Sequence, residues 1–205
     1  MTREEIAREI AKALVETGIE GGFDAVSCST AGDYPSIGCS QWEGSRADDL
    51  LDKIAGGEKF IDRTYSDIEQ AGELEELAAL LDSPEGQQAQ LAQLEADCLY
   101  YVDTLQRIPE LDDSRCIIYA GTWCPTSTIT VATFIERRAG NGYNIRSLEA
   151  LRDMFRDEYA GAACIPVSCY AGYENRAERA YQYVAAIDLT TPYGVPVYGE
   201  GPFGR

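Results

Sequence analysis

The sequence predicts a mostly α-helical domain with a short β-hairpin or loop around residues 23–41. Apolar residues recur every three or four positions along most of the chain, which is the period of an amphipathic helix. Between Phe23 and Gln41 this period disappears, and Ser, Thr, Gly, Asp and Pro dominate instead. The chain has 205 residues, of which 45% are hydrophobic and 25% charged, and this is enough for one sizeable core. We therefore expect residues 1–191 to form one domain, followed by a Pro- and Gly-containing tail at 192–205.

The first helix is predicted to begin at a capping box made by Thr2 and Glu5, and to end near Gly18. A second helix is expected over residues 45–55, and the glycine pair at 56–57 ends it. The apolar face of the first helix is made by residues at helical spacing: Ile6, Ile10 and Leu14.

Residues 64–113 carry thirteen acidic side chains and one basic one, a net charge of −12. The apolar spacing predicts two helices here, one marked by Ile68 to Leu81 and one that follows the Ser83-Pro84 cap and runs to about Leu105. We expect their acidic faces to be solvated surface, and a face that docks a basic partner is the alternative.

The stretch from Cys116 to Ile135 contains no charged residue. It is too polar and too interrupted for a membrane span, so it predicts two buried helices that meet near Pro125. A turn at 140–142 follows, and helices are expected over 148–159 and over about 174–187.

The composition excludes several classes of function. There is no histidine, which removes imidazole bases, Ser-His and Cys-His nucleophiles and His-ligated zinc, and leaves carboxylates as the agents of any hydrolysis. A net charge of −18 argues against binding to nucleic acid. Acidic residues at positions 4, 5 and 9 stand where a signal peptide needs basic and apolar ones, so synthesis in the cytoplasm is expected.

Seven cysteines at irregular spacing form no C-x-x-C motif, so neither a metal nor another cofactor is expected. We interpret them as small buried residues of a reduced protein. A disulfide between Cys28 and Cys39 is the alternative, and a thiol enzyme would rest on the cysteine count alone.

The segment from Glu20 to Leu51 is the most informative part of the chain. It has a carboxylate just after a helix end, then a loop, then a new helix. Gly38 would let the backbone approach a bound chain closely, and the Gln41 amide could bind sugar hydroxyls or N-acetyl groups. Trp42 is a core anchor or a sugar platform, with the core favoured, and Tyr34 is a further groove candidate.

These residues resemble the lysozyme superfamily, and most closely the muramidase domains of phages and prophages of Gram-positive hosts. In those domains an S-I-G-x-x-Q-W segment precedes an R-A-x-x-L-L helix. The similarity covers about residues 5–55, and the matching positions are Ser36, Ile37, Gly38, Gln41, Trp42, Arg46, Ala47, Leu50 and Leu51.

The resemblance implies a lysozyme-like helical fold that cleaves the glycan strand of peptidoglycan. It implies that Glu20 is the acid that protonates the glycosidic oxygen, and that Ser36, Gly38 and Gln41 line the cleft. Partial burial favours the protonated form of such an acid. A second carboxylate would be Asp33 by position, with Asp24 as the alternative. Both hydrolysis and transglycosylation remain open.

Two hypotheses follow for the whole protein. The first is a wall-cleaving enzyme, released by lysis or carried in a virion or injection particle. The second is a non-catalytic structural or binding module that kept the fold and docks particle proteins through its acidic 64–113 face. The second is favoured by two departures from the family, namely Ser27 where an Asn is frequent, and YAGTWCPTS at 119–127 where an Asn-Gln-Gly element is frequent.

Overall fold

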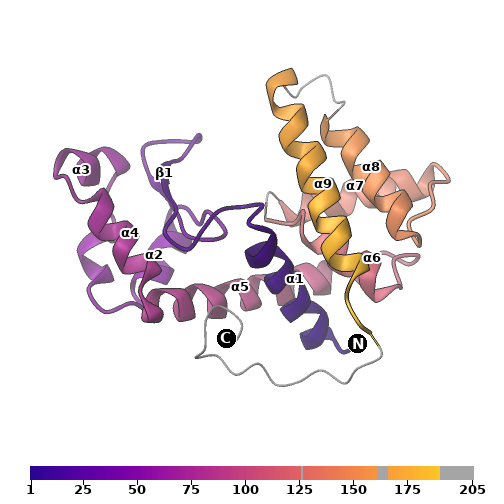
Figure 1. The fold of residues 1–205 in the computed structure, drawn as a ribbon, viewed down its shortest axis with the longest axis horizontal. Helices are drawn as coiled ribbons and strands as arrows, with labels where there is room; N and C mark the ends of the chain where they lie inside the picture. Colours follow the sequence, from indigo (N-terminus) through magenta and orange to yellow (C-terminus); the bar gives the residue numbers. More distant parts are fainter. Residues whose placement is uncertain (126, 161–165, 190–205) are drawn as a thin grey trace. The chain divides into compact units, whose positions relative to one another are not determined.

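The computed structural model describes residues 1–125, 127–160 and 166–189 of the chain (Figure 1). The described chain is mostly helical with a short two-stranded antiparallel sheet, which confirms the predicted fold class. These residues form two compact units, one made of 1–17 with 97–189 and the other of 18–96. The range 1–191, expected as one domain, thus contains both units, while the tail at 192–205 lies outside the described residues.

The unit of residues 18–96 contains the hairpin and the acidic helices. Strands β1 (Val26–Cys28) and β2 (Pro35–Ile37) pair in the register Val26↔Ile37, Ser27↔Ser36 and Cys28↔Pro35. They are followed by α2 (Ser45–Leu51), the short 3-10 helix η1 (Gly57–Phe60), α3 (Tyr65–Gln70), α4 (Leu74–Asp82) and the first part of α5 (Pro84–Leu105). Its core is built from side chains at most 3% exposed: Ile37, Leu50, Leu51, Ile54, Phe60, Ile68, Leu77, Leu81 and Leu94.

The first predicted acidic helix is in fact two helices, because the chain turns at Gly72. Gly72 has a φ of 72°, and its N–H donates to the Glu69 carbonyl at 2.9 Å. The N–H of Glu73 donates to the Ile68 carbonyl at 3.0 Å, which completes a Schellman motif. The apolar period continues across the turn, so a prediction from periodicity alone treats α3 and α4 as one helix.

The predicted cap of α5 is confirmed. The Ser83 hydroxyl accepts from the N–H of Gly86 at 3.0 Å, and Pro84 occupies the first helical position, where a missing N–H costs nothing. This cap fixes the start of α5, the helix that lies under the loops of the candidate site described below.

The other unit packs α1 (Arg3–Thr17) against α6 (Ser114–Gly121) and α9 (Tyr170–Ala185), and α8 (Leu148–Ala160) against α6 and α9. It also contains α7 (Thr128–Gly140) and η2 (Val167–Cys169). The predicted capping box is present: Thr2 and Glu5 exchange backbone-to-side-chain hydrogen bonds of 2.6 and 3.2 Å. The uncharged stretch forms most of α6, which is buried as predicted, and the first part of α7, which buries only one face and leaves Ile129 60% exposed. No helix of the described residues has the length and hydrophobicity to cross a membrane.

Helix α9 begins at Tyr170, earlier than the predicted start near 174. The Tyr173 ring contacts that of Tyr159 in α8 in a tilted arrangement with centroids 5.3 Å apart, and it stacks on Trp123 at 6.5 Å. These ring contacts lie in the first turn of α9, so packing rather than local sequence extends the helix.

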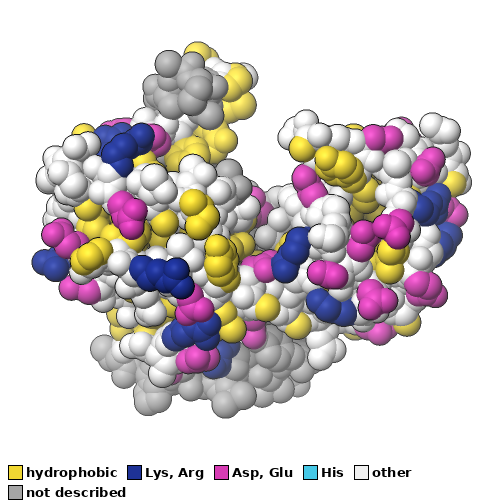
Figure 2. All heavy atoms as spheres, turned by 180° about the vertical axis from the view of Figure 1, so that it is seen from behind, with side chains coloured by type: hydrophobic (Ala, Val, Ile, Leu, Met, Phe, Trp, Pro, Cys, Tyr) yellow, Lys and Arg dark blue, Asp and Glu magenta, His cyan; other side chains and the backbone are white. Residues whose placement is uncertain are grey.

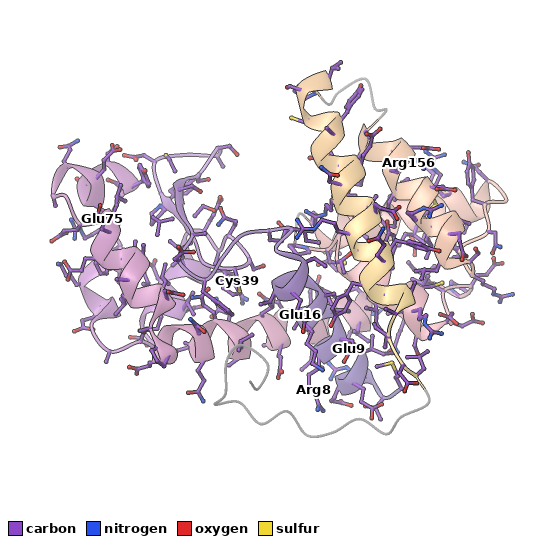
Figure 3. All side chains as sticks on the ribbon, viewed as in Figure 1. Arg8, Glu9, Glu16, Cys39, Glu75 and Arg156 are labelled. Carbon is purple, nitrogen blue, oxygen red and sulfur yellow. The ribbon has the colours of Figure 1, made fainter. Side chains whose placement is uncertain are left out.

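Acidic side chains are spread over the surface rather than gathered in one patch in the view of Figure 2. On α4, Glu75 is exposed and points away from its unit (Figure 3). Glu73 instead forms ion pairs with Lys59 at 2.9 Å and Arg63 at 2.5 Å. This distribution agrees with the expectation of a solvated acidic surface.

Candidate functional site

The S-I-G-x-x-Q-W segment forms a tight loop at the end of the hairpin. Ile37 and Trp42 exchange two backbone hydrogen bonds of 2.9 Å, and the four residues between them make the turn. Gly38 and Gln41, the first and last of these four, have φ values of 72° and 53°. A left-handed conformation at both ends lets so short a loop close, so the motif has a structural reason of its own.

The Gln41 side chain is anchored inside this loop. Its Oε1 accepts from the hydroxyls of Ser27 at 3.1 Å and Ser36 at 3.2 Å, and its Nε2 donates to the Gly38 carbonyl at 3.2 Å. Both acceptor positions of Oε1 are therefore used, while Nε2 keeps a second N–H. The structure thus brings Ser36, Gly38 and Gln41 together, as the resemblance implies.

Gly38 is needed for a close approach, but the approaching group belongs to the protein. A β-carbon placed on Gly38 would lie 2.4 Å from Oε1 of Gln90, a side chain that is 0% exposed. The sequence suggested that Gly38 admits a bound chain. In the structure the space beside its α-carbon is filled by an amide from α5.

Glu20 lies three residues beyond Thr17, the last residue of α1, in the chain that leads into the hairpin. Its side chain is half-buried, and its Oε1 atom is shielded from solvent. A β-carbon on the next residue, Gly21, would lie 3.3 Å from Nε2 of Gln41 and 3.6 Å from the Gly38 carbonyl. The backbone that carries Glu20 therefore runs directly beside the Gln41 loop.

The two aromatic candidates have different surroundings. Trp42 is 5% exposed, so its ring serves as the core anchor that the sequence favoured and its faces are not open to a sugar. Tyr34 is 41% exposed, and its hydroxyl donates to the Ala31 carbonyl at 3.3 Å. Of the two rings, only Tyr34 can stack on a ligand in this conformation.

Asp33 is engaged with the first turn of α3. Its Oδ1 accepts from the backbone N–H of Ser66 at 3.0 Å and from the Ser66 hydroxyl at 2.9 Å. Together with Thr64, whose side chain accepts from the N–H of Asp67 at 3.0 Å, it satisfies N–H groups that a helix start leaves without an acceptor. Asp24, the alternative second carboxylate, is exposed and lies against Gly22.

The disulfide alternative is not realised, because Cys28 and Cys39 are both free. Cys28 is exposed, whereas Cys39 is buried, and burial raises the pKa of its thiol to about 12. Cys98, Cys116 and Cys124 form no disulfide and are buried, as the sequence suggested, while Cys169 forms no disulfide and is exposed. Cys164 lies outside the described residues. Within the described part of the chain, no acidic and cysteine side chains gather into a metal-binding group.

Two glutamines of α5 were missed by the sequence reasoning. Gln90 contacts the loops on both sides of the hairpin, and Gln93 contacts α2, and they are 0% and 4% exposed. A signal was present, since Gln90 precedes Leu94 by four residues and Cys98 by eight and so lies on the buried face of the helix. A polar residue on such a face indicates a buried hydrogen-bond network.

Comparisons with protein-family models, with curated proteins and with solved structures found no match to this chain. The similarity to lysozyme-like muramidases is therefore an inference from the residues between Glu20 and Leu51.

Proposed function

We propose that this chain cleaves the glycan strands of bacterial peptidoglycan, with Glu20 as the general acid. The observation that carries the proposal is the setting of this carboxyl group. One of its oxygens is shielded from solvent while the side chain as a whole is only half-buried. A general acid needs a setting that leaves part of the carboxyl group accessible, because it has to reach the leaving oxygen.

The neighbouring loop supplies groups that suit a sugar chain. Gln41 holds a second N–H on Nε2, and Tyr34 offers an exposed ring on the same hairpin. In this proposal Ser36, Gly38 and Trp42 shape the loop, and Gln41 and Tyr34 contact the substrate.

A mechanism with a single acid/base residue has the better support. The carboxylate of Asp33 is held by Ser66 at the start of α3, which gives it a structural role. Transglycosylation needs one group that first protonates the leaving oxygen and then accepts a proton from the substrate's own hydroxyl as the ring closes. Hydrolysis with Asp33 or Asp24 as the second carboxylate is the competing form of the same proposal.

The second candidate function is a non-catalytic module that binds wall glycan or particle proteins. It is favoured by the internal use of the motif, since Ser36 is 4% exposed and the Gln41 amide is tied to Ser27, Ser36 and Gly38. The fold by itself would require these contacts, so they do not need a catalytic role to explain them.

A clearing assay on purified peptidoglycan separates the two candidates. We expect the wild-type protein to clear the suspension and Glu20→Gln to lose at least about 100-fold in rate, which is the usual contribution of a general acid. Glu16→Gln is the matched control, because Glu16 is an exposed carboxylate near the end of α1. Asp33→Asn should retain the rate if one carboxylate suffices.

Equal clearing by wild type and Glu20→Gln would remove Glu20 from the mechanism. If wild type fails to clear walls of several chemotypes, the enzyme proposal is wrong. Sedimentation of the protein with intact walls would then support the binding module.

A further inference from the structure

Gln90 joins three separate segments of its unit through one buried amide. Its Nε2 donates to the Phe23 carbonyl at 3.1 Å and to the Leu81 carbonyl at 2.9 Å, and its Oε1 accepts from the N–H of Cys39 at 2.9 Å. The side chain is completely buried. Cys39 lies on the side of its loop that is next to α5, where this contact is made (Figure 3).

Only glutamine among the natural side chains satisfies this set of contacts. The set needs two N–H donors and one acceptor at the end of two methylene groups. Asparagine has the same amide but is one methylene shorter. An apolar residue would remove the partner of three backbone groups, and the hydrogen bonds of two of these, the Leu81 carbonyl and the Cys39 N–H, are buried and therefore costly to lose. The absent β-carbon of Gly38 is part of the arrangement, because it leaves room for Oε1.

The segments held by Gln90 are those on both sides of the candidate site. Phe23 follows Glu20 by three residues, and Cys39 lies inside the loop whose last residue is Gln41. The amide therefore fixes the spacing between the chain that carries the acid and the loop that carries the substrate-binding amide. A shift of about 1 Å in such a spacing is enough to lower a catalytic rate substantially.

We propose that Gln90 is a positioning residue, which sets the place of Glu20 relative to Gln41 without touching substrate. This inference rests on the proposed function, because the consequence of the spacing is catalytic. The backbone contacts of Gln90, however, are testable whether or not the protein has activity.

Gln93 is a matched control on the same helix. It is 4% exposed, its Nε2 donates to the Arg46 carbonyl at 2.9 Å, and its Oε1 accepts from Lys53 at 2.8 Å. It thus makes the same kind of buried bridge one turn further along α5, but it holds α2 instead of the Glu20 and Gln41 segments.

The experiment compares Gln90→Met with Gln93→Met in the full chain. Thermal unfolding, kcat and KM on soluble glycan-strand fragments, and hydrogen exchange of the Cys39 amide are measured for both. We expect both variants to be destabilised. We expect only Gln90→Met to lose kcat, by at least about tenfold with a smaller change in KM, and only it to exchange the Cys39 amide faster.

Equal losses of kcat in the two variants would make Gln90 an ordinary structural residue and overturn the proposal. Unchanged exchange at Cys39 in Gln90→Met would overturn it as well. Should that variant not fold, Gln90→Asn serves in its place, because it keeps both ends of the amide but cannot span Phe23 and Cys39 together.

Failure of the proposed function has a different signature. In that case the wild-type protein does not cleave the fragments at all, and the exchange of the Cys39 amide still shows whether Gln90 holds the loop. Faster exchange at Cys39 with no activity in wild type would reject the catalytic consequence and retain the anchoring contact.

Discussion

Gly38 and Gly72 share a φ of 72° but differ in what surrounds them. A β-carbon on Gly38 would lie 2.4 Å from Gln90 Oε1, whereas one on Gly72 would meet no atom within 4 Å. At the residue scale, a comparison of the two positions therefore distinguishes the cost of a left-handed backbone from the cost of a steric clash. Both glycines supply a left-handed turn, and only Gly38 also makes room for a buried side chain.

Gly38→Ala is expected to destabilise the protein by more than Gly72→Ala. The left-handed backbone costs each alanine about 1 kcal/mol, and the displaced Gln90 amide adds about 1–3 kcal/mol at Gly38 because its partners lose their hydrogen bonds. Chemical denaturation of both variants measures the difference. Equal losses would show that Gln90 moves aside freely.

Residue types around Glu20 were predictable from the sequence, but their bonding was not. The resemblance selected Ser36, Gly38 and Gln41 as one group, and the structure brings them together. Nothing in the local sequence indicated that Gly38 faces Gln90, because the two residues are far apart in the chain and meet only through packing.

Several helices in this chain begin at a short polar side chain that caps them. Asp113 caps α6, and its Oδ1 accepts from the N–H groups of Arg115 at 2.8 Å and Cys116 at 3.2 Å. Ser127 and Thr64 play the same part at α7 and α3. At the scale of the element, such caps decide where short helices begin, since few internal hydrogen bonds hold them.

Asp113→Ala should cost about 1 kcal/mol of unfolding free energy, the usual value of an N-cap. Asp112→Ala is the neighbouring control, because Asp112 forms an exposed ion pair with Arg146 at 3.5 Å, and such pairs contribute little. Urea denaturation of the two variants tests this. A loss at Asp112 as large as at Asp113 would contradict the cap.

The elements predicted best are those with an explicit local signal. The Thr2–Glu5 box and the Ser83-Pro84 cap placed two helix starts correctly. The break at Gly72 was missed, since the apolar period runs through it and a single glycine is also tolerated within a helix. The early start of α9 coincides with a contact between the rings of Tyr173 and Tyr159 of α8, which no local pattern contains.

Charge is the property that belongs to the whole molecule. With a net charge of −18 and no histidine, few groups change protonation between about pH 5 and 8. Lys59 and then Arg63, beside Glu73, hold the pKa of that carboxyl below its ordinary value of 4.5. Arg3 does the same for Asp103, whose ordinary pKa is 3.8.

Stability is expected to be nearly constant from about pH 6 to 8 and to fall in acid. A carboxylate with a lowered folded-state pKa adds stability above its ordinary pKa, here 4.5 for Glu73, and this is lost as the pH falls through the lowered value. Thermal unfolding against pH measures it. Glu73→Gln should weaken the acid dependence while the exposed Glu75→Gln leaves it unchanged, and a steep fall between about pH 6 and 8 would refute this assignment.

The sequence by itself determined the helical class and the short hairpin or loop around residues 23–41, because periodicity and turn residues are local facts. Only the tertiary structure decided which side chains meet. It buried Trp42, assigned Asp33 to α3, and placed Gln90 against the Gly38 loop. Contacts between distant residues depend on packing of whole elements, and no pattern within one segment encodes them.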